Sequence, residues 1–115
     1  MAVLFCDREY PDVEEGRDTW SDEAVQHASE LYERIGSDTC TLAVVDRKDG
    51  LMLFFTPSDA DKPVAHHFKC ALAGYTGNGV IASAKILEMF GFGTYDDIFQ
   101  RISHGGDRAR YTLGA

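Results

Sequence analysis

The chain has 115 residues, a length that suits a single domain over residues 1–115. Apolar residues make up 44% and charged residues 26%, and this balance excludes a wholly disordered chain. No apolar stretch comes near the roughly 20 residues that cross a bilayer, and no basic segment followed by an apolar one opens the chain. We therefore expect a cytoplasmic protein that does not bind membranes.

The net charge of −8 is unevenly distributed along the chain. Residues 7–23 carry eight acidic and two basic side chains, a local charge of −6, whereas residues 62–115 carry four acidic and six basic ones, a local charge of +2. The acidic first part argues against long nucleic acids as partners, because their binding depends on the neutralisation of phosphates. The basic last part leaves room for a small anion.

The first elements expected in chain order are a short strand, a loop and a helix. Val3 to Cys6 is a short apolar run typical of an edge strand, and residues 7–18 read as an acidic loop. Ser21 caps the helix that follows, and Gly36 ends it. Its apolar stripe has helical spacing and consists of Ala24, Ala28, Leu31 and Ile35.

Three strands are expected next, over Thr41 to Val45, Leu51 to Phe55 and Val64 to Cys70. The first two are joined by a hairpin turn in which Gly50 takes the left-handed position. The second is apolar on both faces, which predicts a central strand covered on both sides. The third alternates, with one face formed by Val64, His66, Phe68 and Cys70.

The last third is helical. Residues 80–90 are apolar nearly all round, which is typical of a buried helix, and Gly91 ends it. Thr94 caps a second helix together with Asp97, and residues 107–115 form a flexible or partner-contacting tail. This order predicts an α+β fold: a small, mostly antiparallel sheet with one N-terminal helix and two C-terminal helices.

The most informative segment joins the third strand to the buried helix and reads FKCALAGYTGNG over residues 68–79. Its glycine spacing, G-x-x-G-x-G, is neither the dinucleotide nor the P-loop pattern. The N–H groups at a helix start lack intrahelical partners and favour an anion, and the glycines let a ligand approach the backbone. The segment is either a nucleotide or anion site, or a turn that serves only the fold, with Asn78 as a plain N-cap. The candidate ligand-binding residues are Phe68, Gly74, Tyr75, Thr76, Gly77, Asn78 and Gly79.

Two arginines near the C-terminus complete the candidate site. Arg108 and Arg110 lie on one side of the chain if that segment is extended, and guanidinium groups bind phosphate in a bidentate manner. The alternative is a solvated tail. Against it stand Tyr111 and Leu113, which would gain from packing, for example on a second subunit.

Patterns for catalysis or metal binding are weak. His67 and Cys70 have a spacing found in zinc sites, but residues three apart in a strand face opposite sides. Cys70 shares an apolar strand face, and the odd set of Cys6, Cys40 and Cys70 is typical of core thiols in a reduced cytosol. We expect no catalytic residues, no metal and no cofactor.

Residues 68–92 resemble the phage anti-defence sponge proteins that antagonise Thoeris, a bacterial immune system. The resemblance implies a dimer or larger assembly in the host-cell cytoplasm that sequesters cyclic ADP-ribose signals, and in some members cyclic oligonucleotides, without cleaving them. In that family an aromatic residue and an Asn ten positions later contact the ligand, which is the separation of Phe68 and Asn78. Arginines near the C-terminus assist, as Arg108 and Arg110 would here, and Arg47 is the candidate for a basic residue from the first strands.

The leading hypothesis is therefore a non-enzymatic protein, a homodimer or higher homo-oligomer, that binds and sequesters a phosphate-containing nucleotide signal. The alternative is an acidic protein-interaction domain, such as an immunity or adaptor protein, whose residues 7–23 meet a basic partner without any small-molecule ligand. A third option is an enzyme that uses His67 or Cys70.

Overall fold

The computed structural model describes residues 3–5, 8–10, 12–15, 20–35, 40–55, 64–104 and 110–114; the first three ranges and Val64 are described by their backbone alone. The elements are β1 (Val3–Phe5), β2 (Arg8–Tyr10), β3 (Asp12–Glu15), α1 (Ser21–Ile35), β4 (Cys40–Asp46), β5 (Gly50–Phe55), β6 (Val64–Phe68), α2 (Asn78–Met89), α3 (Tyr95–Ser103) and β7 (Arg110–Gly114).

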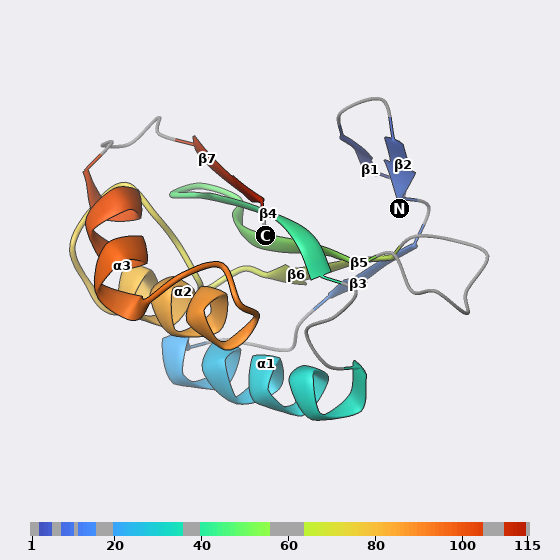
Figure 1. Cartoon of the computed structure of the whole chain (residues 1–115), viewed down its shortest axis with the longest axis horizontal. Helices are drawn as coiled ribbons and strands as arrows, with labels where there is room; N and C mark the ends of the chain where they lie inside the picture. The colour runs from blue at the N-terminus through green and yellow to red at the C-terminus, as the bar shows by residue number, and fades with distance from the viewer. Residues whose placement is uncertain are drawn as a thin grey trace.

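The main sheet has five strands in the order β3-β6-β5-β4-β7, and β1 and β2 form a separate two-stranded sheet. All neighbours in the main sheet are antiparallel except β3 and β6, which are parallel. The three helices lie together on one side of this sheet (Figure 1). The predicted α+β fold, with one N-terminal and two C-terminal helices on a mostly antiparallel sheet, is confirmed.

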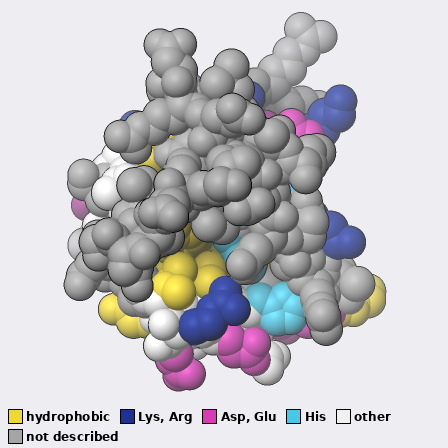
Figure 2. Space-filling view, turned by 90° about the vertical axis from the view of Figure 1, so that its right-hand side faces the viewer, with side chains coloured by type: hydrophobic (Ala, Val, Ile, Leu, Met, Phe, Trp, Pro, Cys, Tyr) yellow, Lys and Arg dark blue, Asp and Glu magenta, His cyan; other side chains and the backbone are white. Residues whose placement is uncertain are grey.

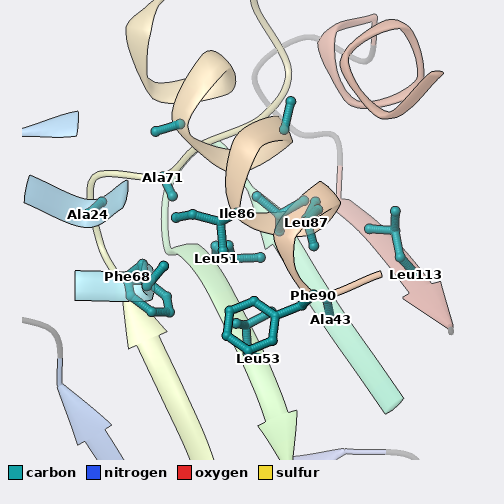
Figure 3. Packing of buried hydrophobic residues seen from close by; sticks show 14 of the residues in the cluster. Ala24, Ala43, Leu51, Leu53, Phe68, Ala71, Ile86, Leu87, Phe90 and Leu113 are labelled. Atoms are coloured by element: carbon teal, nitrogen blue, oxygen red, sulfur yellow. The ribbon is translucent and has the colours of Figure 1, made fainter. Parts of the chain in front are cut away.

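The main core fills the space between the helices and the sheet. Phe68 and Leu53 approach it from the sheet, Ile86 and Leu87 from α2, and Phe90 from the residue that follows α2 (Figure 3). The Phe90 ring meets the Phe55 ring edge to face, with centroids 5.7 Å apart. α2 is buried over most of its surface, as its apolar sequence predicts.

The central strand β5 is buried on both faces. Leu51, Leu53 and Phe55 belong to the main core, whereas Phe54 belongs to a second cluster with Val44 and Ala65. The prediction of a central strand covered on both sides is therefore confirmed.

The two ends of the chain differ from expectation. The predicted acidic loop over residues 7–18 is wrong, because this stretch contains β2 and β3, and β3 pairs with β6. β3 is an edge strand, and edge strands accept charged side chains. In the expected tail, residues 110–114 form the opposite edge strand, β7, while residues 107–109 lie outside the described part of the chain.

The predicted roles of Gly50 in the hairpin turn and of Thr94 at a helix start are confirmed. Gly50 has φ of 86° and closes the β4–β5 hairpin, and Thr94 Oγ1 accepts a hydrogen bond of 3.4 Å from the Asp97 N–H at the start of α3. A Cβ atom on Gly50 would stand 2.5 Å from the carbonyl oxygen of Phe68. Gly50 is therefore required both by its backbone angle and by the close approach of β6.

We expect Gly50→Ala to lower the free energy of unfolding by more than Gly91→Ala does. Both glycines have positive φ, but a Cβ on Gly91 would meet no atom within 4 Å. Gly91→Ala therefore has only the left-handed strain of about 1–2 kcal/mol, whereas Gly50→Ala adds an overpacking cost of about 1–3 kcal/mol. Urea unfolding of the two variants measures the difference, and equal losses would contradict the close contact at Gly50.

Candidate functional site

The strand register brings the predicted site residues to one end of the sheet. Asp46 at the end of β4 pairs with Gly50 and with Arg110, the first residue of β7. Leu51 pairs with Phe68, the last residue of β6, from which the glycine-rich segment leaves. The β4–β5 turn, the start of β7 and the glycine-rich segment therefore share one end of the molecule, the left-hand end in Figure 1.

Backbone hydrogen bonds fix the glycine-rich segment between the helices. The N–H of Gly74, whose φ is 89°, donates to the carbonyl of Ile102 in α3 at 2.7 Å. The N–H of Leu72 donates to the carbonyl of Gly79 at 2.9 Å, and the buried Ser83 hydroxyl donates to the carbonyl of Leu72 at 2.7 Å. The segment is thus pinned to both α2 and α3 before α2 begins.

The Tyr75 ring packs directly on two of the glycines. A Cβ on Gly77 would lie 2.7 Å from Tyr75 Cε2, and one on Gly79 would lie 2.5 Å from the Tyr75 hydroxyl. Gly77 has an extended φ of 170°, so the glycine is needed there for space and not for its backbone angle. The glycine spacing thus allows the half-buried Tyr75 ring to lie against the turn.

Arg47, in the β4–β5 turn, lies over the face of the Tyr75 ring. Its Cζ atom is 4.8 Å from the centroid of the Tyr75 ring, within range of a cation–π interaction. His67 Nε2 donates a hydrogen bond to the carbonyl oxygen of Asp49, which ties the turn that carries Arg47 to β6. Sequence reasoning proposed Arg47 only through the family resemblance; the hairpin ending at Gly50 is the local signal that places this turn beside the end of β6.

The surroundings of Arg47 are basic, although the whole chain is acidic. This end of the sheet and its turns carry four exposed cationic side chains and two carboxylates: Arg47, Lys48, Lys69 and Arg110, with Asp46 and Asp49. The side chain of Arg110 is 62% exposed. Its Nε lies 4.0 Å from Asp46 Oδ2, which is a long distance for an ion pair. At the opposite end of the molecule, a basic side chain lies beside acidic ones and a histidine (Figure 2).

The start of α2 borders a small pocket. Gly77 is the N-cap, without a side-chain hydrogen bond, and no acidic residue occupies the first turn. Asn78 is the first helical residue and is exposed, so the alternative in which Asn78 is a plain N-cap is wrong. A pocket of about 330 Å³ lies between the first turns of α1 and α2, lined by Ser21, Asp22, Val25, Asn78, Ile81, Ala82 and Lys85.

The structure corrects the role expected for Phe68. Its side chain is 0% exposed and belongs to the main core, where its ring lies 4.7 Å from the His66 ring, centroid to centroid. A base cannot stack on it without opening the core. Of the remaining candidates, Gly74, Tyr75, Thr76, Gly77, Asn78, Gly79 and Arg110 lie at the end described above, and Arg108 lies outside the described residues.

The thiol of Cys40 has little reactive character. Cys40 is buried, and desolvation raises the pKa of its thiol to about 12. Cys70 is half-buried against the main core, and Cys6 lies outside the described part of the chain. Within the described ranges, no three His, Cys, Asp or Glu side chains are grouped to hold a metal ion.

Comparisons with known proteins give no relative: no family model, no curated protein and no solved structure matches the chain. Among the described helices, none combines the length and the apolar character needed to cross a membrane.

We expect Cys40 to make the protein less stable at high pH. The unfolded thiol titrates near 9.0, and the folded one only near 12, so above pH 9 the unfolded state loses a proton that the folded state keeps. The free energy of unfolding then falls by up to about 1.4 kcal/mol per pH unit on account of this group. Denaturant titrations of the wild type and of Cys40→Ala between pH 8 and 11 isolate the effect; parallel pH profiles would contradict it.

Proposed function

We propose that the protein binds a phosphate-containing nucleotide signal of the cyclic ADP-ribose class, or a cyclic oligonucleotide, and sequesters it without chemical change, as a phage protein acting against host defence. The observation that carries this proposal is the Arg47–Tyr75 stack on the glycine turn that precedes α2. It places a planar cation and an aromatic ring beside the start of a helix, an arrangement that suits a nucleotide.

Each feature supports a different part of such a ligand. The half-buried ring of Tyr75 and the planar guanidinium of Arg47 would stack on or flank a base. The N–H groups at the start of α2, Lys69 and Arg110 would attract phosphate, and Asn78 would hydrogen-bond a base or ribose. Phe68 takes no part, because it is sealed in the core.

The local charge favours a small anion over a long nucleic acid. Four exposed cations lie at this end of the sheet, while the chain as a whole carries −8. A long polyphosphate chain would extend beyond the basic end and meet acidic surface. A compact cyclic nucleotide would not.

Binding should depend on the stack. In calorimetry with cyclic ADP-ribose isomers and cyclic dinucleotides, we expect Tyr75→Ala and Arg47→Ala to weaken binding by roughly 5- to 150-fold, the equivalent of losing 1–3 kcal/mol of stacking. Tyr75→Phe keeps the ring and should bind nearly as the wild type does. Arg34→Ala removes an equal charge from the last turn of α1 and is the matched control.

Unchanged affinity in both alanine variants would place the ligand elsewhere on the protein. Heating the complex and analysing the released nucleotide distinguishes sequestration from catalysis. Sequestration returns the nucleotide intact, whereas an enzyme acting through His67 or Cys70 returns a product.

One observation favours the alternative of a protein-interaction domain. Trp20 just before α1 is 73% exposed, and Tyr32 and Ile35 near the end of α1 are 38% and 40% exposed.

If a basic protein partner is bound through the acidic first part of the chain, reversing the charges of Asp12, Glu14 and Glu15 should abolish the purified complex. The nucleotide proposal expects these reversals to leave the calorimetric affinity within about twofold of the wild type.

A further inference from the structure

The pocket of about 330 Å³ between α1 and α2 is a site of its own, which shares only Asn78 with the side chains proposed to bind a nucleotide. Its lining consists of Ser21, Asp22 and Val25 from α1 and of Asn78, Ile81, Ala82 and Lys85 from α2, all in the described part of the chain. The two helices pack against each other along their length (Figure 1). The volume lies at the lower end of the range for small-molecule sites, so the pocket suits a ligand much smaller than a cyclic dinucleotide.

The two walls of this pocket carry opposite charges. α1 contributes Asp22, in a first turn that also contains Glu23. α2 contributes Lys85, and the first turn of α2 contains no acidic residue. Both side chains are exposed, and among the interactions of the described residues no ion pair joins them. A ligand that lies between the walls can therefore meet a carboxylate on one side and an ammonium group on the other.

Apolar side chains line the same pocket. Ala82 is buried, and Val25 and Ile81 are half-buried, one on each helix. A short aliphatic group that covers them leaves water, which is favourable. The Ser21 hydroxyl and the Asn78 amide add hydrogen-bonding groups of both kinds, donors and acceptors.

We propose that this pocket binds an aliphatic α-amino acid, with the ligand's ammonium group at Asp22, its carboxylate at Lys85 and its side chain against Val25 and Ile81. In such a molecule the two charges and the aliphatic group are attached to one carbon atom, which is the combination that the pocket offers. A simple anion would pair with Lys85 but face the Asp22 carboxylate, and a simple cation would meet the reverse arrangement. The site goes beyond the proposed nucleotide function and does not depend on it.

The competing interpretation gives the two charges no common ligand. Asp22 would then serve only the start of α1, where a carboxylate is favourable, and Lys85 would be a solvated side chain. The two interpretations differ in what they expect of a ligand that carries only one of the charges.

Trp20 allows binding to be measured directly. It is the only tryptophan of the sequence, it is 73% exposed, and it immediately precedes Ser21 in the pocket lining. The experiment titrates Trp20 fluorescence, with calorimetry in parallel, using L-leucine, L-leucinamide, which lacks the carboxylate, and 4-methylpentanoate, which lacks the ammonium group. We expect saturable binding of L-leucine and binding weaker by roughly tenfold or more for each analogue, the loss expected for one charge-assisted hydrogen bond.

Two variants should exchange this preference. Asp22→Asn removes the partner of the ammonium group, so it should weaken L-leucine by roughly tenfold but bind 4-methylpentanoate no more weakly than the wild type does. Lys85→Gln should weaken L-leucine to a similar extent and leave L-leucinamide unaffected. Glu30→Gln and Arg34→Gln remove equal charges from α1 outside the pocket lining and are the matched controls. A merely structural effect would weaken all three compounds alike.

The proposal is overturned if L-leucine shows no saturation below about 10 mM, if the three compounds bind equally, or if both variants weaken them in parallel. Inorganic phosphate is the last probe. If phosphate or 4-methylpentanoate binds more tightly than L-leucine, the pocket is an anion site and the proposal is wrong. Because no measurement contains nucleotide and none changes Arg47 or Tyr75, failure here is distinct from failure of the nucleotide calorimetry.

Discussion

The contact on which the candidate site depends is the close approach of Gly50 to the backbone at the end of β6. A Cβ at this position would stand 2.5 Å from the Phe68 carbonyl oxygen, so the hairpin can lie this close only because the residue is glycine. The His67 hydrogen bond to the Asp49 carbonyl holds the same turn from the side. Together they bring Arg47 over Tyr75, although the two residues are far apart in the sequence.

Much of the fold follows from local patterns. The doubly apolar stretch from Leu51 to Phe55 predicts the central strand, because only a strand covered on both faces has no polar side, and Gly50 and Thr94 predict the turn and the helix start that the structure contains. The strands β2 and β3 escaped prediction because their side chains are mostly charged. Their pairing depends on a sheet edge supplied by β6, about 50 residues away along the chain.

The candidate site was predictable in place but not in detail. The glycine spacing identifies the turn, yet it does not say that Tyr75 occupies the space that the missing Cβ atoms leave. The alternation of side chains predicts that Phe68 and Cys70 share a strand face. It does not predict that the helices cover this face, because that depends on residues distant in the sequence that pack in the main core. The position of Asn78 inside the helix, one residue after the cap, is likewise set by the extended Gly77.

Two of the described groups that could take part in chemistry, Cys40 and His67, are engaged in the fold. Cys40 is desolvated in the core, which raises the pKa of its thiol and keeps it protonated. His67 Nε2 is occupied in donating to the Asp49 carbonyl, so it holds the turn and does not face a substrate as a free base. The exposed side chains described around the glycine turn include the guanidinium groups of Arg47 and Arg110, the ammonium of Lys69, the hydroxyl of Thr76 and the amide of Asn78, which can recognise a nucleotide by charge and hydrogen bonds. Under the proposed function, such a site would retain its ligand by charge and stacking, and its capacity would be set by the number of protein molecules and not by turnover.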